Sequence, residues 1–143
     1  MEPYPIDIHS SAKDGLIELL DSNDIKYSKE ADDFRFILED GIHKWEAMCS
    51  CAQSAVLVYG FYPFAKAYSE ETMMLLNRIN GELISGSMLS SNERVIMRTS
   101  ADCYDPYSAC AAIARAIEYN AGAIVKYWQE IHHVGTGRMR SFV

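Results

Sequence analysis

The chain lacks any long hydrophobic run and any excess of positive charge. No segment approaches the ~18 consecutive apolar residues that a membrane-spanning helix needs. Its 143 residues include 13 lysines and arginines against 20 aspartates and glutamates, a formal net charge of −7. Nucleic-acid phosphates and anionic lipid headgroups both attract clustered lysine and arginine. We therefore expect neither a nucleic acid nor a membrane as a partner.

A signal peptide and a disulfide framework are also missing. The first seven residues contain two prolines but neither a basic start nor an apolar stretch, so we expect a cytoplasmic protein. In that compartment the four cysteines should be reduced thiols. These are Cys49, Cys51, Cys103 and Cys110, and their spacing does not match a paired zinc motif.

Length and composition fit a single domain over residues 1–143. The chain is 49% hydrophobic and 23% charged, which argues against global disorder. A chain of this size buries roughly 68–70% of its unfolded surface, enough for a core without metals or disulfides. Neither end shows a clear period, so we expect an extended arm over residues 1–9 and a frayed basic tail over residues 134–143.

Three segments carry the apolar spacing or the capping residues of helices. Leucines repeat at helical spacing between about residue 10 and residue 22. Ser69 is a good N-cap for a second helix, which Gly81 is expected to end. The third helix should start at Asp105 and the proline after it. It should run for about 25 residues, longer than the mean of about 11–12, and Gly122 could bend it.

Six strand-like segments fill the rest of the chain. Apolar and polar residues alternate over residues 33–39, as in a half-buried strand, and Asp40-Gly41 predicts a tight hairpin turn after it. Residues 55–62 are apolar at every position, so we expect a central strand covered on both faces and ended by Pro63. The predicted strands span residues 25–30, 33–39, 42–51, 55–62, 83–89 and 93–99.

The predicted order is therefore α-β-β-β-β-α-β-β-α. Hairpins rather than crossovers connect most of the strands, which predicts a largely antiparallel sheet. Helices must pack on at least one face of this sheet to bury residues such as Trp45, Leu57 and Phe61. The fold class that follows is α+β.

The second half of the chain resembles the YbjN-type family, which is labelled a bacterial sensory-transduction regulator. The likeness lies in the helical segment Leu76–Asn80, in a hairpin that ends in Val95–Thr99, and in a long last helix with Tyr127-Trp128. The element order matches over roughly residues 10–132. This resemblance implies a fold similar to type III secretion chaperones, without catalytic residues or a cofactor. It also implies a dimer, or a chaperone-like or regulatory role toward a protein partner.

Cys49 and Cys51 are the strongest candidates for metal or redox chemistry. Thiols at alternate positions of a strand lie on the same face and could bind a soft metal or form a strained disulfide. A closed zinc site needs four ligands, and no other cysteine or histidine pair has matching spacing. The alternative is that both are small core residues beside Trp45 and Ala47. We favour the core, and expect no metal ligand and no catalytic residue.

Five residues are candidates for contacts with a protein partner or between dimer subunits. Aromatic side chains anchor interfaces, and Tyr62, Phe64 and Tyr68 cannot all be internal just after a strand. Core packing is the alternative for them. Asn77 and Asn80 lie on one helix face and could offer their amides to a partner. They could instead satisfy backbone groups of the hairpin that follows.

We therefore expect a non-enzymatic protein-binding domain, chaperone-like or a regulatory adaptor, that acts as a homodimer. Such a domain should have an exposed apolar patch and a sheet edge open to pairing. The alternative is a small-molecule or metal-binding module that uses Cys49 and Cys51. That module would need a concave pocket in which polar groups converge.

Overall fold

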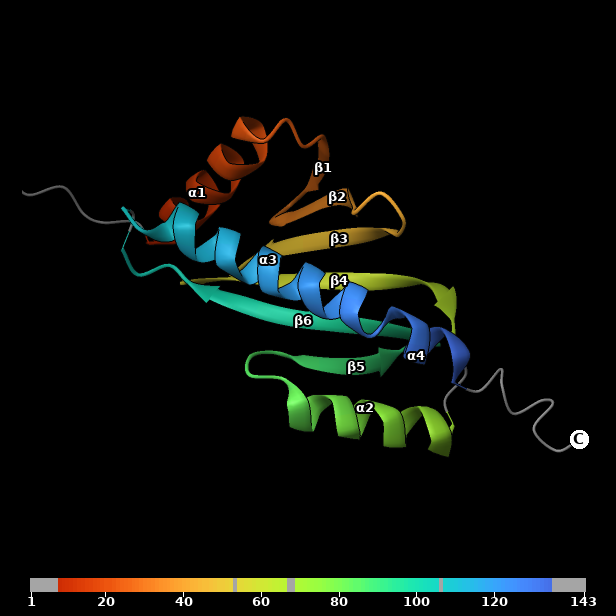
Figure 1. Ribbon diagram of the computed structural model, residues 1–143. Helices are drawn as coiled ribbons and strands as arrows, with labels where there is room; N and C mark the ends of the chain where they lie inside the picture. The colour runs from red at the N-terminus through yellow and green to blue at the C-terminus, as the bar shows by residue number, and fades with distance from the viewer. Residues whose placement is uncertain (1–7, 53, 67–68, 106, 135–143) are drawn as a thin grey trace, which may run out of the picture.

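The computed structural model describes residues 8–134 except residues 53, 67–68 and 106 (Figure 1). The described residues form six strands and four helices, in the predicted order except that the last helix is split in two. The α+β prediction is thus confirmed. The elements are α1 Ile8–Ser22, β1 Tyr27–Glu30, β2 Asp33–Glu39, β3 Lys44–Cys51, β4 Ala55–Ala65, α2 Glu70–Glu82, β5 Ser87–Ser91, β6 Arg94–Asp102, α3 Ala109–Lys126 and α4 Trp128–His133.

The predicted arm and tail lie almost entirely outside the described residues. α1 already begins at Ile8, two residues inside the segment predicted to be extended. At the other end α4 stops at His133, and Val134 is its extended C-cap.

All six strands join one antiparallel sheet in the order β1-β2-β3-β4-β6-β5. Hairpins connect β1 to β4 in succession. The chain then leaves β4, forms α2 and returns as β5 at the far edge, so that β6 pairs with β4 (Figure 1). The two edges of the sheet are therefore β1 and β5.

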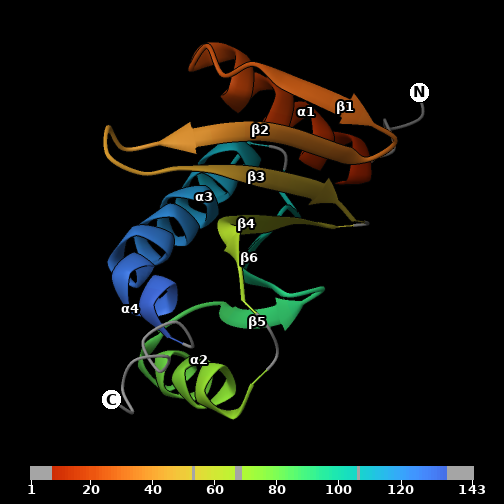
Figure 2. The ribbon, with the colours of Figure 1, turned by 90° about the vertical axis from the view of Figure 1, so that its right-hand side faces the viewer.

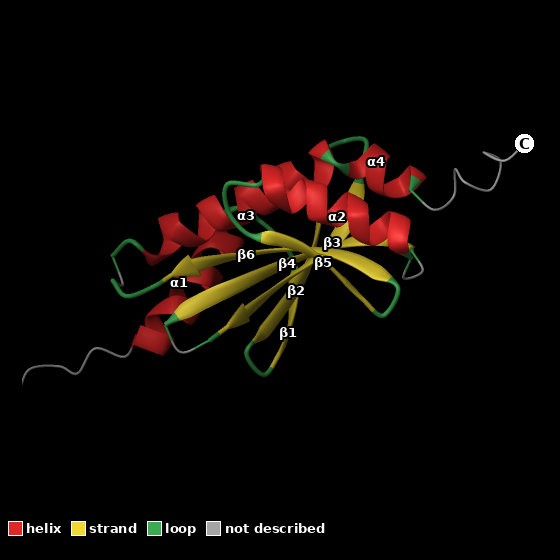
Figure 3. Cartoon of the chain, turned by 90° about the horizontal axis from the view of Figure 1, so that it is seen from below, coloured by secondary structure: helices red, strands yellow, loops and turns green. Residues whose placement is uncertain are grey.

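The helices pack on one face of the sheet. Figure 3 shows α2, α3 and α4 along the same side of the strands, and Figure 2 shows α2 beside the edge strand β5. α1 packs with α3 against the same face, because its buried residues join the cluster formed by the inward residues of β2, β3 and β4. None of the helices in the described part of the chain is long and apolar enough to cross a membrane.

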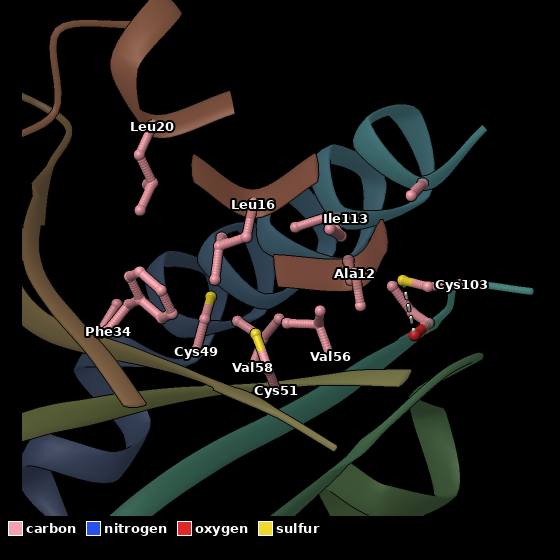
Figure 4. Packing of buried hydrophobic residues seen from close by; sticks show 14 of the residues in the cluster. Ala12, Leu16, Leu20, Phe34, Cys49, Cys51, Val56, Val58, Cys103 and Ile113 are labelled. Atoms are coloured by element: carbon pink, nitrogen blue, oxygen red, sulfur yellow. Dashed lines mark hydrogen bonds between the residues drawn. The ribbon is translucent and has the colours of Figure 1, made fainter. Parts of the chain in front are cut away.

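Two clusters of buried side chains hold the helices to this face. In the first, Leu16 of α1 and Ile113 of α3 pack on Phe34 and its neighbours (Figure 4). In the second, Ile79 of α2 and Ile124 of α3 pack around the ends of β4, β5 and β6. The strands contribute only alternate residues to these clusters. This is the period of two that the sequence predicted for β2.

Two predictions for β4 are wrong. The strand continues through Pro63, because its ladder with β6 shifts register between Phe61 and Ala65. A proline, which has no N–H to donate, is tolerated at such an irregularity. The strand is central as predicted but not covered on both faces. Leu57 and Tyr59 are only half-buried, as is Phe61, because the helices occupy the opposite face.

The ends of α2 agree in part with the prediction. Ser69 caps the helix as predicted, since its Oγ accepts the backbone N–H of Thr72 at 3.1 Å. The helix does not stop at Gly81 but runs to Glu82, and the N–H of Leu83 still donates to the carbonyl of Ile79 at 3.0 Å. Gly81 is tolerated there because its position is exposed and a single helical glycine costs only about 1 kcal/mol relative to alanine.

The last helix starts later than predicted and is broken rather than bent. Oδ1 of Asp105 accepts the N–H of Tyr107 at 2.9 Å, which closes a turn, so α3 begins only after it. The break lies at Tyr127, whose φ of −101° and ψ of 9° separate α3 from α4. A side chain of β4 forms a hydrogen bond with the helix backbone just before this break. The hydroxyl of Tyr62 donates to the carbonyl of Ile124 at 2.7 Å.

The hairpin between β2 and β3 turns at the predicted Asp40-Gly41, and the N–H of Asp40 donates to the carbonyl of His43 at 3.1 Å across the turn. Oδ1 of Asp40 accepts the N–H groups of Ile42 and His43 at 2.9 and 2.6 Å. Gly41 supplies a φ of +94° in this loop, which a side chain would disfavour. The ring of His43, at the end of this turn, packs on that of Trp128 with centroids 4.4 Å apart.

These hydrogen bonds, first that from the N–H of His43, lower the pKa of Asp40 to about 2. Because this folded-state pKa lies below the ordinary 3.8, the stability that it contributes is present above pH 3.8 and is lost as the pH falls through 2. We expect NMR titration of the carboxyl carbon to give a midpoint near 2. In Asp40→Asn the free energy of unfolding should depend less on pH between 3.8 and about 2 than in the wild type. A midpoint at 3.8 would contradict the loop geometry.

Candidate protein-binding surface

None of the described helices or strands covers the side of the sheet opposite the helices. Antiparallel register places alternate residues of neighbouring strands in rows across it, such as Met48, Tyr59 and Arg98 on β3, β4 and β6. We call this surface the open face. Its central residues are Arg35, Ile37, Glu46, Met48, Leu57, Tyr59, Phe61, Arg94, Ile96 and Arg98.

Two aromatic rings occupy the middle of the open face. Tyr59 and Phe61 stack along β4 with their centroids 6.4 Å apart and their planes 22° from parallel. Each ring also carries an arginine from β6. The guanidinium of Arg98 lies 6.0 Å from the Tyr59 centroid and that of Arg94 lies 4.9 Å from the Phe61 centroid. Apolar rings and cations therefore share one surface, each partly covering the other.

The β2 side of the open face combines a charge pair with an exposed apolar side chain. Nη1 of Arg35 lies 3.4 Å from Oε2 of Glu46, and both side chains are partly in solvent. Ile37 is 52% exposed beside them. An open hollow of about 540 Å³ adjoins these three residues and is lined on its other side by residues 24–28 at the β1 edge. The open face thus continues from β4 to this edge as a mixed polar and apolar surface.

Two of the three predicted aromatic candidates, Tyr62 and Phe64, lie on the opposite face of the sheet. Tyr62 has no exposed surface, and its ring packs against Phe64 and Trp128 with centroid distances of 5.4 and 5.5 Å. Phe64 is half-buried and also contacts Trp128, at 5.5 Å, and His132, at 4.8 Å. Tyr62 therefore follows the core-packing alternative, while Phe64 keeps some surface. The third candidate, Tyr68, lies outside the described residues.

The two asparagine candidates behave differently. Asn77 is exposed on α2. Asn80 is bonded to the backbone of Met88 in β5: Met88 N–H donates to Oδ1 at 2.7 Å, and Nδ2 donates to the Met88 carbonyl at 3.0 Å. The structural alternative, in which the amide satisfies the following hairpin, therefore holds for Asn80.

This amide occupies part of the β5 edge. Met88 pairs with Met97 of β6 on its inner side, so the groups that it offers to Asn80 face outward. The side-chain amide makes the two backbone hydrogen bonds that a neighbouring strand would make, so another chain cannot pair with β5 at Met88. The opposite edge, β1, has only four residues, Tyr27–Glu30, and no strand in the described part of the chain pairs with its outer side.

We expect Asn80→Ala to lower the free energy of unfolding by about 1–2 kcal/mol, since two hydrogen bonds to a partly buried backbone are lost. Urea denaturation would measure the change. Asn77→Ala is the matched control, because Asn77 is exposed on the same helix and alanine favours a helix. An equal loss in both variants would contradict the role assigned to Asn80.

The cysteine pair lies in the core. Cys49 is fully buried and Cys51 is 4% exposed, both between the sheet and α1 (Figure 4). Burial raises the pKa of Cys49 well above its usual range and that of Cys51 to about 11. Metals and oxidants react with the thiolate, which these positions disfavour. The arrangement therefore matches the core alternative.

Sequence reasoning missed the open face, although a signal for it was present. The expected second layer over residues 55–62 came from their apolar character alone. The flanking strands contradict a second layer, because Arg35 and Arg98 lie in the row of Tyr59 and Glu46 lies in the row of Phe61. Charged residues across one face of neighbouring strands are typical of a sheet that faces solvent on that side.

Comparison with known proteins supports the fold alone. No protein-family model matches the chain, and no curated protein is similar enough to match it. Among solved structures the chain is similar to YbjN of E. coli, described provisionally as a transcription regulator. The two chains are 11% identical with a TM-score of 0.57, and the match covers 85% of this chain and 93% of that chain. This likeness confirms the expected YbjN-type fold and transfers no residue roles.

Proposed function

We propose that this chain is a non-enzymatic protein-binding domain that works as a dimer, in a chaperone-like or regulatory adaptor role. The observation that carries the proposal is the open face, where Tyr59 and Phe61 are half-buried at the centre of an uncovered sheet. Large aromatic side chains bury much area at low entropy cost, which makes them common anchors of protein interfaces. The similarity of fold to YbjN, described as a transcription regulator, supports the regulatory role.

Three further features favour binding over catalysis. The hollow of about 540 Å³ is an open depression on a mixed surface, not a closed pocket. Among the described residues, no group of three or more His, Cys, Asp or Glu side chains is placed to hold a metal ion. Raised pKa values also make Cys49 and Cys51 poor nucleophiles and poor ligands.

The test of protein binding is capture from the native cell, followed by mass spectrometry. The bait is the wild-type chain in parallel with a Tyr59→Ser/Phe61→Ser variant, which removes the two rings and leaves the helix side untouched. Tyr107→Ser is the control, since Tyr107 is 97% exposed on the connection between β6 and α3 and is not one of the open-face residues. We expect a protein enriched by the wild type and the control but lost with the double variant. Identical capture by all three would contradict the proposal.

The dimer is tested separately by size-exclusion chromatography with light scattering. We expect a mass about twice the chain mass of 16.1 kDa. A strictly monomeric species, even at high concentration, would remove the dimer from the proposal and leave protein binding to be judged by the capture experiment.

A further inference from the structure

The centre of the open face is cationic although the chain as a whole is acidic. Arg94 and Arg98 stack over Phe61 and Tyr59. Within the described residues, neither guanidinium has a carboxylate at ion-pair distance. Nη2 of Arg94 donates to the carbonyl of Tyr62 at 3.4 Å, and the remaining N–H groups of the two guanidinium groups can donate to a carboxylate. The two arginines are therefore positioned to receive anions beside an apolar surface.

We propose that the open face binds an acidic amphipathic helix of a partner protein. Its apolar stripe would lie on Leu57, Tyr59 and Phe61, and its carboxylates would meet Arg94 and Arg98. This inference rests on the proposed protein-binding function and specifies the chemistry of the partner.

The apolar centre favours a helix over an extended segment. A helix satisfies its own backbone N–H and C=O groups, so it can lie on Tyr59 and Phe61 without burying unpaired polar atoms. An extended segment would need a sheet edge for those groups. The β5 edge is partly taken by Asn80 and the β1 edge is short, so neither edge serves the central rings.

The spacing of the arginines sets the spacing of the acidic residues. Arg94 and Arg98 are four residues apart on β6, which separates their Cα atoms by roughly 13 Å. On a helix, residues seven or eight apart are separated by roughly 10–12 Å along the axis and lie on nearly the same face. The partner helix should therefore carry glutamates or aspartates two turns apart, next to its apolar stripe.

The ends of the same strands disfavour a nucleic acid. Asp33, Glu39 and Asp102 lie at strand ends on the open face, by the alternation of their strands. A polynucleotide carries a charge at each nucleotide and would bring phosphates toward these carboxylates. A helix can place its charges at the arginines alone.

A second copy of this chain is a poorer occupant of the open face. The central residues include three arginines, Arg35, Arg94 and Arg98, but a single carboxylate, Glu46, which already pairs with Arg35. A symmetric contact between two open faces would bring like charges together. The dimer of the proposed function should therefore use another surface.

The test measures binding of a fluorescein-labelled synthetic peptide to the full chain by fluorescence anisotropy. The peptide is an alanine-based helix of roughly 18 residues, with a leucine stripe and two glutamates two turns apart beside it. The control peptides replace the glutamates by lysine or the leucines by serine, and a labelled single-stranded DNA is a third probe. The protein variants are Arg94→Gln and Arg98→Gln, with Arg115→Gln on α3 as the control.

We expect the glutamate peptide to bind and each open-face variant to weaken it about tenfold, with little change for Arg115→Gln. The lysine and serine peptides should bind at least about tenfold more weakly than the glutamate peptide. The inference is overturned if the arginine variants bind equally well, if the lysine peptide binds as tightly, or if the DNA binds in preference to the peptide. It is also overturned if Arg94→Gln and Arg98→Gln alter the oligomeric mass of the protein but leave peptide binding unchanged. Circular dichroism melting would confirm that each variant folds.

Failure of this inference is separable from failure of the proposed function. If the glutamate peptide does not bind but native capture still depends on Tyr59 and Phe61, the function stands and the partner is not an acidic helix. If capture is also independent of these rings, both proposals fall.

Discussion

Tyr62→Ala is expected to lower the free energy of unfolding by about 3–5 kcal/mol, the usual range for truncating a large aromatic side chain in a core. The ring has no exposed surface and packs against Phe64 and Trp128. Its hydroxyl donates to the carbonyl of Ile124, one of the last four of α3, which lack ordinary helical partners. One side chain thus joins β4 to the junction of α3 and α4. Urea denaturation would measure the loss.

Tyr62→Phe separates the hydroxyl from the ring. It should cost only about 1–2 kcal/mol, since the ring remains and a single buried carbonyl loses its donor. A loss as large as that of Tyr62→Ala would contradict this division. It would mean that the hydrogen bond, rather than the packing, holds the helix junction to the sheet.

Gly60→Ala should be the second severe substitution, with a loss of about 2–3 kcal/mol. A Cβ at this position would lie 2.5 Å from Oδ1 of Asn120 and 3.1 Å from Cδ1 of Ile124. The amide of Asn120 cannot easily swing away. Its Nδ2 donates to the carbonyls of Val58 and Met97 at 3.1 and 2.9 Å, which ties α3 to both central strands.

A double-mutant cycle tests whether the amide is the obstacle. In Gly60→Ala/Asn120→Ala the clash partner is gone, so the combined loss should fall short of the sum of the single losses by about 1 kcal/mol or more. Gly122→Ala is the matched control. Nothing lies within 4 Å of a Cβ at that helical position, and we expect a gain of about 0.5–1 kcal/mol. Strict additivity in the cycle would contradict the assigned contact.

Local patterns predicted the strands well where one face is apolar and the other polar. β2 has the predicted bounds, Asp33–Glu39, because alternation reports directly which side chains point to the core. Ser69 was recognisable as a cap because its role depends on an N–H only three residues away. The cysteine pair likewise lies in the core, as residues of that size beside Trp45 and Ala47 suggested.

The candidate site was harder to predict, because it depends on which face of the sheet the helices leave without packing contacts. An apolar residue on a strand has the same local signature whether a helix covers it or not. Tyr62 and Phe61 are neighbours in β4, yet one is wholly buried and the other lies on the open face. Asn80 and Asn77 share a helix face in sequence terms, but only Asn80 reaches the edge of β5. These differences follow from the position of whole elements.

The sequence by itself determined the order of helices and strands, the antiparallel hairpins and the inward face of a strand such as β2, because these depend on neighbours within a few residues. Only the tertiary structure decided that every described helix packs on one side and that the last helix breaks at Tyr127. It also decided that no described helix packs on Tyr59 and Phe61, whose rings contact two arginines. Those outcomes depend on contacts between segments far apart along the chain, and no local period encodes them.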